Sequence, residues 1–287
     1  MLWLLPLLHL VSAQHVIKSE WLRIGPGTSD SLLPDGGLGQ PFYKSNVTGW
    51  TKLTYSNYEI DFSFKVDGQL ARIANDVTLN FVNSSYAEST AQLVLDGVPQ
   101  ATLKRTYNFL FQGVVFQTSL EVTALRDLDS IEAWMGTADD WIGSTDKPTK
   151  EQGVLTPGGF KAKAHGTVMH LFSGQEEVFI YSPHKASHAI ILSHYGRWSD
   201  VYGSQTSDLS SSTSDGAYGI YVPLGHATRG QVRKASIFYA ALGPASGAGI
   251  HDSFPTCGEA AQKGKLEEMS QNRKSLVQEL EGARERE

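Results

Sequence analysis

The feature that most constrains the fold is a series of short segments in which apolar and polar residues alternate. Residues 59–66 show it clearly, since Ile60, Phe62, Phe64 and Val66 alternate with Glu59, Asp61, Ser63 and Lys65. A period of two is typical of a strand with one buried face. About a dozen such segments follow one another at spacings of roughly ten residues, with no helical period between them. The sequence therefore predicts an all-β fold, a large antiparallel β-sandwich.

Glycine-containing turns predict how neighbouring strands are joined. Asp-Gly pairs occur at residues 67–68 and 96–97, and such pairs favour the tight turn of a β-hairpin. Gly113 separates two long runs, 103–111 and 114–124, that are rich in β-branched and aromatic residues. We therefore expect three hairpins, centred on these glycines.

The end of the β region has its own pattern. Residues 232–241 carry apolar side chains on both faces, which is typical of a central strand. The closing segment, residues 219–243, holds Val222-Pro223-Leu224-Gly225 and then Gly230 before an aromatic strand. This arrangement resembles the final strand pair of surface and adhesion β-sandwich modules, and it implies that the last two strands pair with each other.

Changes in composition divide the chain into five segments. We expect a secretory signal peptide (1–13), an irregular lead-in (14–49) with one short strand at 21–24, the β-sandwich (50–242), a Gly/Ala-rich linker (243–258) and an amphipathic helix or short coiled coil (259–287). The alternative for the first segment is a buried strand or helix. Within the sandwich, the polar stretch 197–216, with Ser and Thr at 210–214, predicts a mobile loop or insert.

Charge and glycosylation signals bear on location. The net charge of −6 comes without a basic patch, so nucleic acid is not an expected partner. No run after the leader reaches eighteen apolar residues, so we expect no membrane span. Asn46 and Asn83 each begin an Asn-x-Ser/Thr triplet, the acceptor for N-glycosylation. These signals predict a glycosylated protein that is secreted or on the cell surface.

The C-terminal segment predicts assembly. One stripe of the expected helix carries apolar residues, Leu266, Met269, Leu276 and Leu280, together with Arg273. Two copies could bury this stripe in a homodimer, and Cys257, the only cysteine, could then form an intermolecular disulfide. The alternatives are an isolated helix, or one packed on its own sandwich with a reduced thiol.

A long loop at residues 134–148 is the best candidate site, because it concentrates two tryptophans and three aspartates. Its carboxylates, Asp139, Asp140 and Asp146, could supply oxygens to calcium, the only cofactor that the sequence indicates. The alternative is a loop whose aspartates cap its own turns.

The same loop allows a carbohydrate site. Trp134 and Trp141 could stack on sugar rings, and the alternative is that both plug the ends of the sandwich. In an enzyme, two carboxylates among Glu132, Asp139, Asp140 and Asp146 would act as acid and as nucleophile or base. No spacing selects a pair.

Other catalytic patterns are missing. The sequence contains no Gly-x-Ser-x-Gly, no His-Glu-x-x-His, no P-loop and no dinucleotide fingerprint. His184, His188 and His194 do not have a spacing that favours zinc, because His188 and His194 would lie about 20 Å apart on one strand.

Two functions from different classes follow. The first is a non-catalytic binding or structural module of an extracellular layer or appendage, with a protein or glycan partner. The alternative is a carbohydrate-active enzyme or lectin that uses the central loop.

Overall fold

The computed structural model describes residues 15–27, 30–45, 49–110, 113, 115–156, 159–174, 176–184, 186–192 and 211–242, and this part of the chain is nearly all β. The strands, in chain order, are β1 (Leu22–Ile24), β2 (Pro41–Ser45), β3 (Gly49–Lys52), β4 (Asp61–Val66), β5 (Gln69–Ile73), β6 (Thr78–Asn83), β7 (Tyr86–Leu95), β8 (Val98–Leu110), β9 (Val115–Ala124), β10 (Ile131–Thr137), β11 (Thr149–Thr156), β12 (Gly159–Ala162), β13 (Val168–Ser173), β14 (Glu176–Tyr181), β15 (His188–Ile191), β16 (Ser211–Ser212), β17 (Tyr218–Pro223) and β18 (Val232–Leu242).

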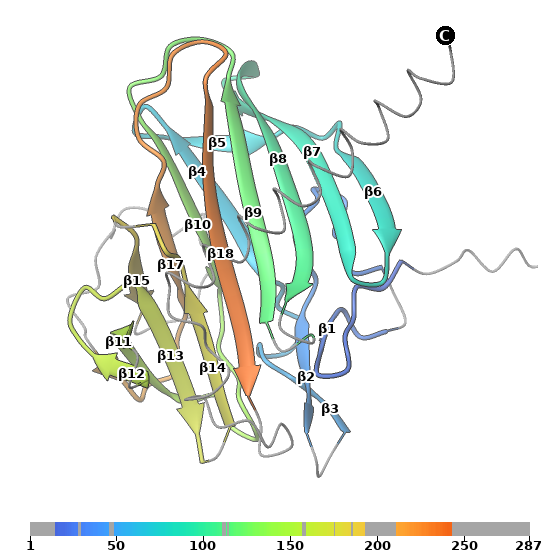
Figure 1. Cartoon of the computed structure of the whole chain (residues 1–287), viewed down its shortest axis with the longest axis vertical. Helices are drawn as coiled ribbons and strands as arrows, with labels where there is room; N and C mark the ends of the chain where they lie inside the picture. Colours follow the sequence, from blue (N-terminus) through green and yellow to red (C-terminus); the bar gives the residue numbers. More distant parts are fainter. Residues whose placement is uncertain are drawn as a thin grey trace, which may run out of the picture.

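Most strands belong to one long antiparallel sheet, whose order is β12-β11-β13-β14-β18-β9-β8-β7-β5-β4-β10-β17-β15 (Figure 1). β6 is added beside β7, β16 is added beside β11, and β1 to β3 form a separate small sheet. β5 pairs with β4 through Phe64 and Ala71 and with β7 through Ile73 and Leu93. It therefore joins a larger arm, β12 to β7, to a smaller arm, β4 to β15.

The two arms pack face to face around one core. Phe62 of the smaller arm meets Tyr107 of the larger arm, with ring centroids 6.3 Å apart. The hydroxyls of Tyr218 and Tyr239 lie 3.2 Å apart across the same interface. A single cluster of buried apolar side chains draws on both arms, which is the packing of a β-sandwich. The predicted fold class is confirmed for the β part.

The alternation seen in the sequence produces this core. Along β9, inward residues such as Leu120 and Val122 are buried, and the residues between them are partly exposed. In β4, Phe62, Phe64 and Val66 are buried as predicted. Lys65 is buried as well, because its ammonium lies over the ring of Trp134.

The predicted hairpins are present. Asp67 and Gly68 both have positive φ, as do Asp96 and Gly97, which is the geometry that two-residue hairpin turns require. β8 and β9 pair continuously from Ala101 opposite Ala124 to Leu110 opposite Val115. β18 is central, since it lies between β9 and β14.

Four expectations differ from the structure. The lead-in (14–49) is less irregular than expected: besides β1, which matches the short strand expected at 21–24, it contains β2, and it buries Ile17, Leu22 and Leu38 in the main core. β11 was not predicted. β10 continues through Gly136 to Thr137, so the central loop begins at Ala138. The last two strands do not pair with each other, because β17 lies between β10 and β15 in the smaller arm.

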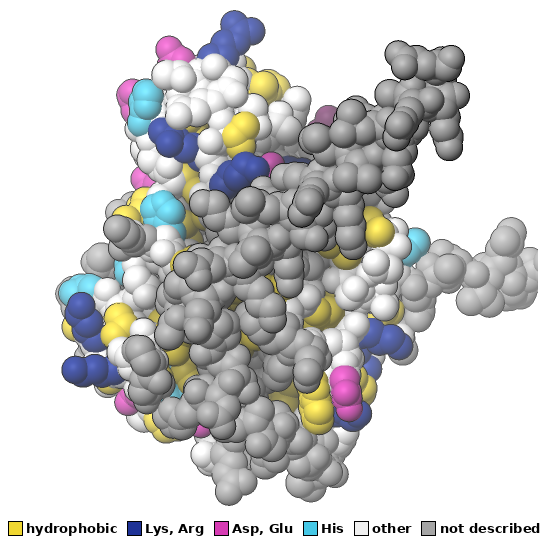
Figure 2. Space-filling view, in the orientation of Figure 1, with side chains coloured by type: hydrophobic (Ala, Val, Ile, Leu, Met, Phe, Trp, Pro, Cys, Tyr) yellow, Lys and Arg dark blue, Asp and Glu magenta, His cyan; other side chains and the backbone are white. Residues whose placement is uncertain are grey.

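Several predictions lie outside the described residues. They are the signal peptide (1–13), the Asn46 site, the linker (243–258), the C-terminal helix (259–287) and Cys257. Within the described residues, no helix has the length and apolar character needed to cross a bilayer. On the face in Figure 2, the coloured basic and acidic side chains are interspersed rather than gathered by sign.

Candidate functional site

The site is built where β10 ends. At its last two positions, Gly136 and Thr137 still pair with Gly219 and Tyr218 of β17. Beyond them, the backbone N–H of Asp140 donates to the carbonyl of Gly216 at 3.0 Å. The central loop and the segment before β17 therefore run side by side, although about 75 residues separate them in the sequence.

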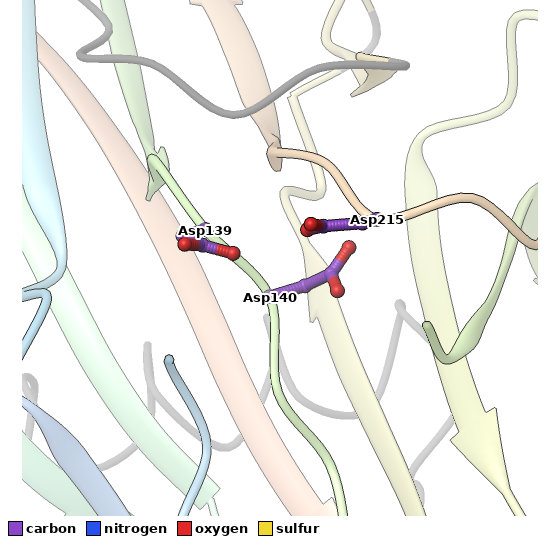
Figure 3. A group of neighbouring side chains, drawn as sticks. All are labelled: Asp139, Asp140 and Asp215. Atoms are coloured by element: carbon purple, nitrogen blue, oxygen red, sulfur yellow. The ribbon is translucent and has the colours of Figure 1, made fainter. Parts of the chain in front are cut away.

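Three aspartates meet at this junction. Each of Asp139, Asp140 and Asp215 offers a carboxylate oxygen, and these oxygens all lie within 4.8 Å of one another. Asp140 is fully buried and Asp139 is 6% exposed. Figure 3 shows Asp215 pointing from its own segment toward the two aspartates that follow β10. We call these three residues the acidic cluster.

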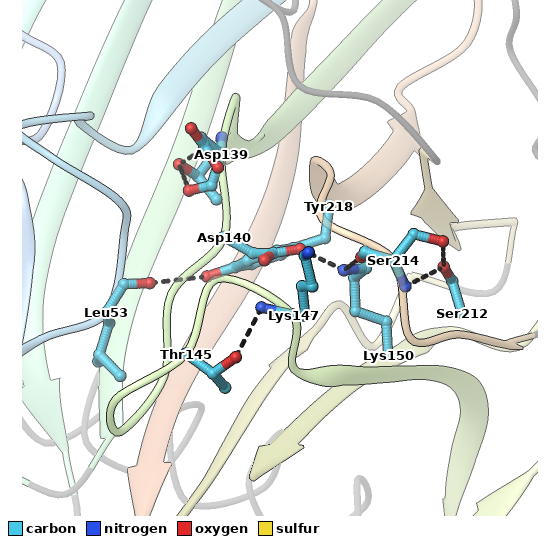
Figure 4. Close-up of polar contacts among 10 residues, drawn as sticks. Leu53, Asp139, Asp140, Thr145, Lys147, Lys150, Ser212, Ser214 and Tyr218 are labelled. Carbon is cyan, nitrogen blue, oxygen red and sulfur yellow. Dashed lines mark hydrogen bonds and ion pairs between the residues drawn. The ribbon is translucent and has the colours of Figure 1, made fainter.

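One side of the acidic cluster is neutralised by a buried lysine. The ammonium of Lys150, on β11, donates to Oδ2 of Asp140, and both side chains are fully buried. The same ammonium donates to the carbonyl of Ser214 at 2.6 Å (Figure 4). Behind the pair, the Tyr218 hydroxyl donates to the carbonyl of Leu53. Lys150 thus links β11 to the central loop, which precedes it closely in the sequence, and to the segment before β17, which is distant.

The remaining charge is poorly compensated. Burial, followed by the charge and hydrogen bond of Asp215, raises the pKa of Asp139 to about 6. Burial raises the pKa of Asp140 to about 7, even though the Lys150 ammonium acts in the opposite direction. Oδ1 of each cluster member is buried and has no hydrogen-bond partner among the described residues. Such oxygens only accept hydrogen bonds, so a hydrogen-bond donor, a bound proton or a cation is needed to satisfy them.

A cleft of about 1130 Å³ opens beside the acidic cluster. It is lined by Asp35, Tyr55, Ser56, Asn57, Tyr58, Glu59, Asp61, Phe62, Ser63, Phe64, Leu70, Ala71, Arg72, Ile73, Ala138, Asp139, Asp146 and Asp215. Six of these residues are acidic and one, Arg72, is basic, so the described lining has a strongly negative character.

The two tryptophans have different surroundings. Trp134 is 2% exposed and packs against Ile190, Leu192 and Ala217, so it offers no free face for a sugar. The prediction that Trp134 stacks on a ligand is therefore wrong. Its position on β10 directs the ring into a small buried apolar cluster beside the main core. Trp141 is half-buried, and its indole N–H donates to the Gly143 carbonyl at 3.1 Å.

An aromatic group stands next to the cleft. Tyr55, which lines the cleft and is 40% exposed, lies with its ring centroid 5.5 Å from that of Trp141. The Lys52 ammonium lies over both rings, at 4.4 Å from the centroid of Trp141 and 5.1 Å from that of Tyr55. Tyr55 was not singled out in the sequence, because no motif surrounds it.

The structure regroups the predicted acidic residues. Asp139 and Asp140 come together as expected, whereas Asp146 lies outside the acidic cluster and lines the cleft. Glu132 lies on β10 and hydrogen-bonds Tyr221, away from the cluster. Asp215 was missed, since it ends a polar stretch that was predicted to be a mobile loop. Its place in the site becomes evident only from its proximity to Asp139 and Asp140, which follow β10.

Two other predicted positions can be placed. Asn83 is exposed at the end of β6, where its Oδ1 accepts hydrogen bonds from the backbone N–H and the hydroxyl of Ser85. Its glycosylation stays a prediction. His188 packs on Tyr221, with ring centroids 4.6 Å apart, and His194 lies outside the described residues.

Comparisons with known proteins give a likeness of fold. No family model matches the chain, and no curated protein matches it in sequence. A bacterial glucoamylase solved with acarbose is 12% identical with a TM-score of 0.51, and the match covers 79% of this chain and 32% of the glucoamylase. The chain thus spans about a third of that enzyme.

Two further structures are more distant. A galactose mutarotase related enzyme from Lactobacillus acidophilus is 6% identical with a TM-score of 0.47, covering 80% of this chain and 97% of that one. The heparan sulfate lyase HepC from Pedobacter heparinus is 10% identical with a TM-score of 0.42, covering 77% and 32%. Both TM-scores are below that of the glucoamylase match, and at identities this low the likeness concerns the fold alone.

Proposed function

We propose that this chain is an extracellular carbohydrate-binding protein whose ligand occupies the cleft beside the acidic cluster. The observation that carries the proposal is the composition of the cleft: carboxylates along its walls and an exposed tyrosine, Tyr55, at its edge. Carboxylates accept hydrogen bonds from sugar hydroxyls, and aromatic faces contact the C–H groups of sugar rings. The likeness to carbohydrate-active enzymes supports the proposal at the level of the fold alone.

The charge of the cleft narrows the ligand class. Six acidic residues and one arginine in the described lining would repel a sulfated or uronic-acid-rich chain. The same residues favour a neutral glycan or one that bears amines. The proposed ligand is therefore a neutral or amine-bearing oligosaccharide, about as large as a cleft of this volume accommodates.

The proposed location is the cell surface or the extracellular space. It rests on the leader-like start of the sequence and on the two glycosylation triplets. The exposed position of Asn83 at the end of β6 is compatible with a glycan there.

The test is a glycan array followed by titration calorimetry with the sugars that bind. We expect neutral or amine-bearing oligosaccharides to bind and sulfated ones not to bind. Tyr55→Ala and Asp146→Asn should each weaken binding by roughly tenfold or more, which corresponds to about 1.4 kcal/mol. Asp96→Asn, the same chemical change in the exposed β7–β8 turn, is the control and should bind as the unmodified chain does. Binding that is unchanged in both cleft variants would reject the cleft as the site.

Hydrolysis of the bound sugar is the second candidate function. The observation that favours it is Asp139, a carboxyl in the cleft whose raised pKa, about 6, suits a general acid. The geometry does not single out a second carboxyl for it: oxygens of Asp139, Asp140 and Asp215 all lie within 4.8 Å of one another, whereas a glycosidase uses two carboxyls set about 5 to 5.5 Å or 6.5 to 9.5 Å apart. Binding is therefore the better-supported function. If the protein hydrolysed a sugar found on the array and Asp139→Asn abolished that hydrolysis, hydrolysis would become the better-supported function.

A further inference from the structure

The arrangement of the acidic cluster matches what a single bound cation needs. Two oxygens that bind one calcium ion at 2.3–2.6 Å each lie at most about 5 Å apart. The cluster oxygens of Asp139, Asp140 and Asp215 all fall within 4.8 Å of one another, so one ion can reach all three. Figure 3 shows that they come from two separate segments of the chain.

The charge balance points the same way. When all three carboxyls are ionised, the Lys150 ammonium leaves two negative charges in a region where Asp140 is fully buried and Asp139 nearly so. Because isolated charge is costly to bury, two unbalanced negative charges require a compensating partner. A divalent cation supplies that compensation in full.

The hydrogen-bond pattern shows where the partner belongs. Lys150 occupies Oδ2 of Asp140, whereas Oδ1 of Asp140 and Oδ1 of Asp139 are buried without any hydrogen-bond partner among the residues that the structure describes. Oδ1 of Asp215 is in the same condition. Each of the three aspartates therefore has one buried oxygen without a hydrogen-bond partner in the described part of the chain. In Asp140 this oxygen is Oδ1, because Oδ2 already binds Lys150.

We propose that Asp139, Asp140 and Asp215 form a calcium site that fastens the central loop to the segment preceding β17. The donors are all oxygens, which hard cations prefer, and calcium tolerates an irregular set completed by backbone carbonyls or water. Asp146, which the sequence placed among the ligands, lies outside this set and contributes charge from the cleft. The site goes beyond the proposed glycan function and does not depend on it.

The experiment uses the full chain, freed of metal with a chelator and without any sugar. Calcium titration by calorimetry should show saturable binding, and calcium should raise Tm by several degrees, since the ion binds the folded state alone. Asp215→Asn should abolish both effects. Because this variant also removes like-charge repulsion, it should fold in chelator with a Tm no lower than that of the unmodified chain. Asp96→Asn, the exposed control, should keep the full calcium response.

Two outcomes would overturn the calcium site. One is an unchanged Tm together with no binding heat up to millimolar calcium, which would mean that a shared proton satisfies the cluster. The other is a calcium response in Asp215→Asn equal to that of the unmodified chain. A second variant, Asp139→Asn, guards against a folding defect at position 215 and should also lose the response. Failure here leaves the glycan proposal standing, because Tyr55→Ala tests that proposal separately.

Discussion

The strands β7 to β9 and the junction around the acidic cluster are stabilised in opposite ways. In β7 to β9, strands of 10, 13 and 10 residues pair with their neighbours in the sequence, and buried side chains alternate with partly exposed ones. At the junction, short segments that are distant in the sequence meet around a buried ion pair and three carboxylates. The first region is held by apolar burial and local pairing, and the second by a few polar contacts of long range.

The difference teaches where function can be placed on such a fold. A regular ladder satisfies its backbone groups and buries one apolar face, so it offers few unsatisfied polar groups to a ligand. The junction leaves polar oxygens open beside a cleft. This contrast predicts that the same substitution has different effects in the two regions.

The largest contrast concerns lysine. Lys150→Met leaves Asp140 buried without its partner, and we expect unfolding free energy to fall by about 3–5 kcal/mol. Lys104→Met removes a comparable ion pair with Glu88 on the partly exposed surface of β8, and the expected loss is about 0–1 kcal/mol. Urea unfolding of both variants measures the difference. Equal losses would show that the junction does not depend on its buried ion pair.

The next contrast concerns pH. Asp139 has a folded-state pKa of about 6 against its ordinary value of 3.8, so the folded chain keeps this proton after the unfolded chain has released it. The contribution of Asp139 to the free energy of unfolding should therefore fall as pH rises from about 4 to 6 and stay low above that range. In chelator, Asp139→Asn should reduce this decline, as measured by Tm at a series of pH values.

Asp67, in the β4–β5 turn, serves as the comparison with the opposite sign. Burial alone would raise its pKa, but hydrogen bonds from Ser130, Arg126 and Asp129 lower the pKa overall. Ionised Asp67 therefore stabilises the folded chain above the pKa that Asp67 has in the unfolded chain. This stabilisation is lost as the pH falls through the lower pKa that it has in the folded chain. Asp67→Asn should therefore lower stability at neutral pH and reduce the loss in acid. The same sign of change in both variants would contradict the contrast.

The smallest contrast concerns two glycines with positive φ. A Cβ at Gly97, in the β7–β8 turn, would meet nothing within 4 Å, so Gly97→Ala should cost only about 1 kcal/mol of backbone strain. A Cβ at Gly143, in the central loop, would lie 2.3 Å from Oε2 of Glu176. Glu176 hydrogen-bonds Tyr43, so Gly143→Ala must displace it and should cost more. Thermal unfolding of the two variants compares the costs, and an equal loss would show that Glu176 moves freely.

Prediction from sequence succeeded where the signal is local. The hairpin of β8 and β9 follows from alternation and one glycine, and the Asp-Gly turns fixed the ends of β4 and β7. β11 was missed because its charged and polar residues, among them Lys150, do not alternate by hydropathy. That lysine is nevertheless fully buried, since its partner Asp140 comes from another segment.

The candidate site was predicted in part. Asp139 and Asp140 were singled out because they are adjacent in an unusual loop, and they do lie together. Trp134 was predicted to contact a ligand because of its residue type, whereas its position on β10 directs the side chain into a buried apolar cluster. Asp215 carries no local signal, because a single aspartate after a serine-rich stretch is typical of a solvated loop.

The sequence by itself determined the all-β class, the hairpin turns and the acidic central loop. These features depend on backbone preferences and on a period of two, which act over a few residues. Only the tertiary structure decided that β5 joins two arms, that β17 lies beside β10, and that Asp215 therefore reaches Asp139 and Asp140. The reason is physical: which distant strands pair depends on the burial of whole sheet faces, and a site assembled by that pairing has no signature in any one segment.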